Sequence, residues 1–321
     1  MKIKKALKYI LSAAFAVALL WFSFRDVEWA TFMEELKSCN WQFIALSMAA
    51  GVFAFWLRAI RWRQLIIPID PKITRLTAFN GVNIGNISNF IFPRIGEFVR
   101  CGVIVRRTTA TYDKVLGTVV LERSWELLVM LLMLLLVVVA GFERFGTFFL
   151  EEIWAPMSQK LNMWWMLAVA VAAGAAAIWM IRKFKDRNAF CSKVYGIFAG
   201  ILQGFSSCLR MERKWMFFAY TALIWVVYWT MSACTVWSAP FLSHLDIVDA
   251  LFLSLVGGLG FAVPVPGGIG AFHFIIALTL TAVYDVPMET GIIYATISHT
   301  SQAITQIVCG LASYSYEVLK K

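Results

Sequence analysis

Apolar stretches long enough to form membrane-spanning helices recur along the chain, separated by short polar and charged segments. A helix that crosses the hydrocarbon core of a bilayer needs about 20 mostly apolar residues. The segments of this kind are Ala6–Phe24, Trp41–Leu57, Val115–Gly141, Met163–Ile181, Trp215–Ala239 and Met288–Ser313. The pattern therefore predicts an all-α polytopic membrane protein with six crossing helices.

The first apolar segment differs from a cleaved export signal. It follows the basic start Met1–Lys5, as a signal does, but it continues into Trp21, Phe22 and Phe24 without a small-residue cleavage site. We therefore expect a retained first helix.

Two further apolar stretches are interrupted at their centres. Leu76–Arg107 contains the sequence from Pro93 to Gly96, and Ala250–Asp285 contains Pro264-Val-Pro-Gly-Gly-Ile-Gly270. Each half is too short to cross a bilayer alone, so two re-entrant helical hairpins are predicted. The second half of each hairpin begins at the proline-glycine break, where free backbone N–H groups and the positive end of the helix dipole favour an anion. The alternative is that glycine and proline only make the sharp turn, and both roles can hold together.

The interrupted stretches belong to an internal repeat. An offset of 173 to 174 residues places Trp41 on Trp215, Val115 near Met288, and the first proline-glycine motif on the second. Helix, hairpin and helix then occur twice, with the hairpins entering from opposite sides of the membrane, which is the inverted-topology arrangement of many transporters. Short glycine-proline matches also arise by chance, but agreement of three elements on one offset favours a repeat.

Composition and charge agree with this architecture. A chain of 321 residues that is 60% hydrophobic, with a mean hydropathy of +0.73, has too much apolar surface for a water-soluble core. The net charge of +10 comes from short basic clusters beside the apolar runs. Such clusters are orientation signals and argue against nucleic-acid binding. They place both termini in the cytoplasm and the protein in the cytoplasmic membrane as a multi-pass protein.

The predicted organisation is one integral membrane domain over residues 1–321. A glycine-spaced segment between basic flanks, Ala189–Leu209, is interpreted as an interfacial helix on the cytoplasmic face, with a seventh span as the alternative. The parts are the first helix with an external loop (1–40), repeat unit A (41–141), the connecting and interfacial helices (142–214), repeat unit B (215–313) and a cytoplasmic tail (314–321).

Cysteine and histidine spacing gives no support for a metal, a cofactor or a disulfide framework. The six cysteines include no CxxC pair, and the three histidines form no HExxH motif. We expect the cysteines to be small buried hydrophobic residues.

Charged residues within an apolar helix are candidates for function. Glu122, Arg123 and Glu126 interrupt the segment Val115–Gly141, and the two glutamates share one helix face because they are four residues apart. The alternative is that this part of the helix extends into the cytoplasm with solvated charges.

Charges in the first hairpin also suggest an anion site. Arg94, Glu97 and Arg100 are predicted on one side of its second helix, where an arginine can hold a phosphate through two hydrogen bonds and Glu97 can pair with a neighbouring cation. Ordinary positive-inside anchoring is the competing interpretation. Polar residues in the first hairpin indicate a wet cavity, and those in the last helix fit a cavity or interhelical hydrogen bonds equally well. They are Asn80, Asn83, Asn86, Ser88 and Asn89, and Ser298, His299, Gln302, Thr305 and Gln306.

Taken in order, these motifs resemble the lysylphosphatidylglycerol synthase transmembrane family, a flippase-like domain, over nearly the whole chain. The resemblance is carried by Trp56-Leu-Arg58 with Arg61-Trp62, Pro93-Arg-Ile-Gly-Glu97 with Arg100, Glu122-Arg123, and Pro264 to Gly270. One departure is His273, at a position where the family commonly has an acidic residue; a histidine could carry a proton there instead. The resemblance implies a free-standing member that keeps the lipid-moving part without the aminoacyl-transferase domain, and therefore no enzymatic activity of its own.

The predicted function is movement of an anionic phospholipid or a polyprenyl-phosphate-linked lipid between leaflets, with the headgroup bound between the two hairpin tips. A membrane enzyme or accessory in lipid-linked glycosyl or aminoacyl transfer, and a small-solute transporter, are the alternatives. The glycine spacings would permit a homodimer without requiring one. The predicted substrate-binding residues are Arg94, Gly96, Glu97, Arg100, Glu122, Arg123, Glu126, Pro266, Gly267, Gly268, Gly270 and His273, and the predicted cavity-lining residues are Asn83, Asn86, Asn89, His299 and Gln302.

Overall fold

A computed structural model describes residues 28–146, 214–261 and 263–320, with a few isolated positions elsewhere. All regular secondary structure in these ranges is helical. The predicted first helix, the predicted span Met163–Ile181 and the interfacial helix Ala189–Leu209 lie outside the described residues, apart from isolated positions.

The described helices follow one order twice: a long helix, a pair of short helices and a second long helix. A short helix, α2 (Trp29–Ser38), precedes the first set. The first set is α3 (Trp41–Ile66), α4 (Arg75–Ile91), α5 (Gly96–Arg107) and α6 (Tyr112–Ala140), and the second is α10 (Lys214–Ser238), α11 (Ile247–Gly260), α12 (Ala271–Tyr284) and α13 (Met288–Leu319). Short helical turns also occur: a π-helical turn η1 (Phe142–Gly146) and the 3₁₀ turns η3 (Pro240–Leu242) and η4 (Pro266–Gly268).

Four described segments are long and apolar enough to cross a membrane: α3, α6, α10 and the stretch Pro266–Tyr284. Three of them were predicted as spans. Pro266–Tyr284 was instead assigned to a hairpin, and its regular helix α12 is only 14 residues, or about 21 Å, because η4 and Gly270 occupy its start. The predicted span in α13 forms the longest described helix, but its polar residues keep it out of this apolar group.

The two interrupted stretches fold as helical pairs, as predicted. In the first pair, the helices pack at very short range, because a Cβ on Gly96 would overlap the carbonyl oxygen of Gly85. Thr74 caps the start of α4, where its side chain accepts a hydrogen bond from the N–H of Thr77. In the second pair, Asp246 caps α11 by accepting from the N–H of Asp249 at 2.9 Å.

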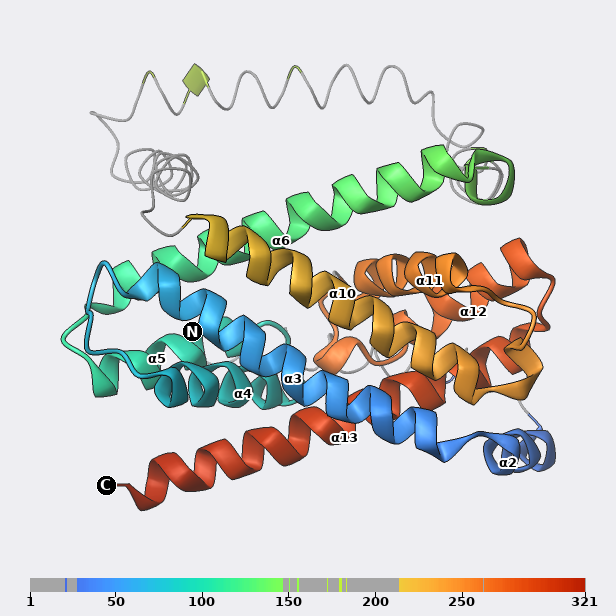
Figure 1. Ribbon diagram of the computed structural model, residues 1–321, viewed down its shortest axis with the longest axis horizontal. Helices are drawn as coiled ribbons and strands as arrows, with labels where there is room; N and C mark the ends of the chain where they lie inside the picture. The colour runs from blue at the N-terminus through green and yellow to red at the C-terminus, as the bar shows by residue number, and fades with distance from the viewer. Residues whose placement is uncertain are drawn as a thin grey trace.

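The long helices α3 and α10 pack side by side and run antiparallel, since the N–H of Asn40 before α3 donates to the carbonyl of Ser238 at the end of α10. The α4–α5 pair lies at one end of this helix pair and the α11–α12 pair at the other (Figure 1). Their tips meet, because the ring of Phe90 fills the space beside Gly267.

The last helix of each set packs on the short pair of the other set: α13 contacts α4, and α6 contacts α11. The α6 surface turned away from these contacts carries half-exposed apolar side chains, as a lipid-facing surface does. These residues are Leu127, Leu128, Leu131, Leu132, Leu135 and Leu136.

Candidate functional site

Three helices bring seven charged side chains together beside the tip of the first hairpin. We call this group the ion cluster. Its members are Arg58 and Arg61 from α3, Glu97 and Arg100 from α5, and Glu122, Arg123 and Glu126 from α6. Four guanidinium groups face three carboxylates, which leaves one net positive charge.

The deepest part of the ion cluster is Arg61 with two glutamates. The side chains of Arg61 and Glu122 are both fully buried, and Arg61 Nη2 lies 3.4 Å from Glu122 Oε1. The same Nη2 contacts Glu126 Oε1, while Nη1 donates to Thr221 Oγ1 of α10 at 3.4 Å. One arginine therefore links α3, α6 and α10.

Arg100 is held from both sides. Its Nη1 donates to Glu122 Oε2 at 2.7 Å, and its Nη2 lies 2.8 Å from Glu97 Oε2. The guanidinium group stacks over the ring of Trp62, 4.6 Å from the ring centroid, and Trp62 is fixed by donating to Thr118 Oγ1 at 2.9 Å. Arg100 is only 2% exposed, so it has little freedom to turn toward solvent.

Arg123 is the member of the cluster that reaches outward. Its side chain is 39% exposed, although Nε lies 2.8 Å from Glu97 Oε1 and Nη1 donates to Glu126 Oε2 at 2.6 Å. Arg58 is the least satisfied: Glu126 is 3.8 Å away, and among the described residues its Nε and Nη2 have no hydrogen-bond acceptor.

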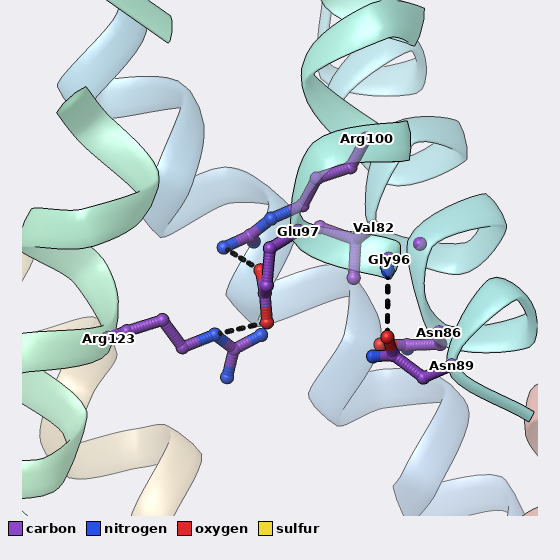
Figure 2. Close-up of a pocket in the computed structure, with 8 residues that line it drawn as sticks. Val82, Asn86, Asn89, Gly96, Glu97, Arg100 and Arg123 are labelled. Atoms are coloured by element: carbon purple, nitrogen blue, oxygen red, sulfur yellow. Dashed lines mark hydrogen bonds and ion pairs between the residues drawn. The ribbon is translucent and has the colours of Figure 1, made fainter. Parts of the chain in front are cut away.

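A small pocket opens between α4, α5 and α6 at the edge of the ion cluster (Figure 2). It is a shallow depression with no enclosed space for a water molecule, so this conformation is closed to a headgroup. Asn89 accepts a hydrogen bond from the N–H of Gly96 at 2.8 Å. The residues that line the pocket are Val82, Gly85, Asn86, Asn89, Gly96, Glu97, Arg100 and Arg123.

The predicted residues of the second hairpin form a separate group. Gly267, Gly268 and Gly270 all have positive φ angles, which fits the turn role of this motif, and Pro266 begins the 3₁₀ turn η4. Gly270 donates its N–H to Nδ1 of the buried His273 at 3.3 Å.

His299 of α13 fixes this second tip, since its Nε2 donates to the carbonyl of Gly267 at 2.9 Å. The rings of His273 and His299 are 5.0 Å apart. None of these residues lines the pocket beside Arg123, and Phe90 fills the contact between the tips. The predicted headgroup site between the two hairpin tips is therefore closed in this structure.

Several predicted residues lie away from the pocket. Arg94 does not share a face of α5 with Glu97, because it sits in the turn before that helix with φ of 59° and is exposed. Asn83 is buried and donates to Ser313 Oγ at 3.2 Å. Gln302 donates to Ser47 Oγ at 3.0 Å, so at this position the polar stripe of α13 makes a hydrogen bond to another helix, α3.

The N–H groups predicted to be free at the start of the second helix of each hairpin are partly bonded to side chains. The N–H of Gly96 is bonded to Asn89 and that of Gly270 to His273. Side chains therefore already occupy one orphan donor at each of these helix starts.

Arg58 and Arg61 are not among the residues predicted for the site. Their cluster was interpreted as an orientation signal, but in the structure they are 8% and 0% exposed. Their spacing of three residues within an apolar helix, beside Trp56 and Trp62, is the signal that could have identified them. The alternative of a solvated extension for Glu122 is not supported, because this side chain is fully buried.

The fold and the site define a multi-pass helical membrane protein with a buried ion cluster. The model of the lysylphosphatidylglycerol synthase transmembrane region matches residues 9–310, and the chain belongs to this family. No curated protein and no solved structure matches the chain.

Proposed function

We propose that the protein moves an anionic phospholipid or a polyprenyl-phosphate-linked lipid between the leaflets of the cytoplasmic membrane. The observation that carries this proposal is Arg123, a partly exposed guanidinium group that lines a small pocket at the edge of a buried ion cluster. Membership of the flippase-like family supports the same function.

Charge supports an anionic substrate. The ion cluster has one more arginine than glutamate, so a headgroup with a single negative charge would bring it to neutrality. Arginine suits this role because its planar donors match phosphate oxygens.

The proposed route across the membrane uses an inverted-topology repeat with six crossings, two re-entrant hairpins and both termini in the cytoplasm. The antiparallel course of α3 and α10 and the hairpins at opposite ends support this arrangement. The contacts made at the ends of α6 and α13, the last helix of each set, also support the repeat. Glu317, at the end of α13, contacts Asn80 and Arg107 of the first hairpin.

Arg144, in η1 just after α6, makes the corresponding contacts with the second hairpin. It donates to Asp249 Oδ2 at 3.0 Å and stacks over Tyr284 at 5.1 Å. Arg144 and Glu317 are separated by the repeat offset of 173 residues. Transport would require the two units to rock and the pocket to open, with the headgroup bound on the side of the first hairpin.

The test is binding of lipid to the purified protein by native mass spectrometry. The wild type is expected to retain an anionic lipid that the Arg123→Ala variant loses. The matched control is Arg106→Ala, on the exposed surface of α5, which should retain it. Equal retention by Arg123→Ala would reject the site.

The same preparation separates the other functions. Formation of product from a labelled glycosyl or aminoacyl donor would indicate a membrane enzyme, and selective binding of a soluble anion with no lipid would indicate a small-solute transporter.

A further inference from the structure

The three carboxylates of the ion cluster are held in different ways. Glu122 and Glu126 accept hydrogen bonds from arginine donors. Glu97 lies 2.8 Å from Arg100 Nη2 and 2.8 Å from Arg123 Nε. Within the described residues, however, neither of these nitrogens nor Glu97 Oε2 has a partner in hydrogen-bond geometry. Glu97 is therefore held by charge more than by directed hydrogen bonds, and it is the carboxylate most easily replaced.

Glu97 is also the carboxylate at the pocket. It lines the pocket with Arg100 and Arg123, whereas Glu122 and Glu126 do not. Its side chain is 24% exposed, compared with 19% for Glu126 and 0% for Glu122. Figure 2 shows it between the two arginines, bridging them.

A third donor faces the same space. Asn86 lines the pocket from α4, and its Nδ2 is buried with no acceptor among the described residues. A buried donor without an acceptor is destabilising, because nothing replaces the hydrogen bond that it made to water. With Arg100 Nη2 and Arg123 Nε, it makes a set of donors that a carboxylate satisfies poorly.

We propose that the Glu97 carboxylate is a resident anion, which occupies the headgroup site when no lipid is bound and which the lipid phosphate displaces. The proposal rests on the proposed function and adds a substrate requirement: an anion with several oxygens that can bridge Arg100 and Arg123 and reach Asn86. A phosphate group has this geometry, whereas a second carboxylate repeats the contacts of Glu97. The displaced side chain turns to the pocket mouth, where water solvates it.

The experiment compares wild type, Glu97→Gln and Glu143→Gln for binding of short-chain phosphatidylglycerol, measured by calorimetry in detergent. Glutamine keeps the shape of Glu97 and removes its charge, so the dissociation constant is expected to fall by about tenfold, the change that about 1.4 kcal/mol produces. Glu143→Gln makes the same change at an exposed position of η1, outside the pocket, and should bind as the wild type does. Short-chain phosphatidylcholine and inorganic phosphate, used as separate probes, distinguish a lipid headgroup from a free anion.

If the wild type binds phosphatidylglycerol and Glu97→Gln binds it equally or more weakly, the displacement of Glu97 by lipid is rejected. If Glu97→Gln binds phosphatidylglycerol and the wild type does not, the displacement of Glu97 is supported. If neither protein binds an anionic lipid while both remain folded, the proposed function itself fails. Should Glu97→Gln not fold, Glu97→Asp provides the test: its carboxylate reaches less far, so binding tighter than wild type is expected, and weaker or unchanged binding contradicts the exchange.

Discussion

At the scale of single residues, burial decides what each charge does. Arg61 and Glu122 are enclosed by protein and exist as partners, while Arg106 on the surface of α5 is free to meet water or lipid headgroups. The cost of removing one member of a buried pair is therefore much larger than the cost at the surface.

Glu122→Ala should strongly destabilise the protein. The substitution removes a carboxylate that Arg61 and Arg100 share and adds one uncompensated positive charge to the buried cluster, and such losses cost about 3–5 kcal/mol. Thermal unfolding in detergent measures the effect. Glu317→Gln, in a partly exposed pair with Arg107, should cost less than about 1 kcal/mol. Similar losses in the two variants would contradict the burial of Glu122.

Asp70 gives the protein a defined pH dependence outside the membrane-spanning helices. Its side chain accepts hydrogen bonds from the N–H and Oγ1 of Thr109 at 2.7 and 2.9 Å and from the N–H of Lys72 at 2.9 Å. These bonds, the backbone N–H of Thr109 first, hold the pKa of Asp70 below its ordinary value.

Because the pKa of Asp70 is lower in the folded state, its stabilisation is complete above the unfolded value of about 3.9 and is lost as pH falls through the folded value. Asp70→Asn should therefore lower the unfolding temperature at pH 7. The difference from wild type should shrink as the pH falls below about 4. A difference that is constant with pH would assign the effect to packing alone.

At the scale of elements, the first hairpin depends on a backbone contact that only glycine permits. Gly96 begins α5 directly against Gly85 of α4, and this contact places Glu97 and Arg100 beside α6. The helix pair therefore positions two members of the ion cluster through a residue that carries no functional group.

Gly96→Ala should force α4 and α5 apart, because the added Cβ would overlap the Gly85 carbonyl oxygen. Overpacking of this kind costs about 1–3 kcal/mol or more, and lipid binding at the pocket should weaken with it. Gly102→Ala is the matched control on the same helix, since its Cβ would meet no atom within 4 Å. Thermal unfolding and lipid binding of both variants provide the comparison, and equal behaviour would argue against the close contact.

At the scale of the whole molecule, the two helix sets are tied together by charges at both ends. Arg144 joins the end of α6 to α11 and α12, and Glu317 joins the end of α13 to α4 and α5. Each contact links one set to the short helix pair of the other.

Breaking one of these contacts should loosen one end of the molecule only. Arg144→Ala is expected to raise hydrogen exchange in α11, measured by mass spectrometry, and to leave α5 unchanged. Glu317→Gln should produce the reverse pattern. A uniform rise in both variants would show that the two ends are not independent.

The sequence by itself determined the membrane class, the family resemblance and most of the described helices, because these depend on local hydrophobicity and on proline-glycine breaks. The pattern predicted the α4–α5 and α11–α12 pairs, and it selected Glu97, Glu122, Arg123 and Glu126 as candidates, which the structure brings into one ion cluster. Only the tertiary structure decided which charges meet. Arg58 and Arg61 enter the cluster because α3 packs against α6 and α10, and Arg94 stays outside because the chain turns before α5 begins. The two tips meet through Phe90 and Gly267, and the pocket lies between the first hairpin and α6, with no residue of the second hairpin in its lining. The hydrophobic periodicity of a helix shows which of its residues share a face. The partner of a buried charge, in contrast, is set by contacts between helices that are far apart in the chain.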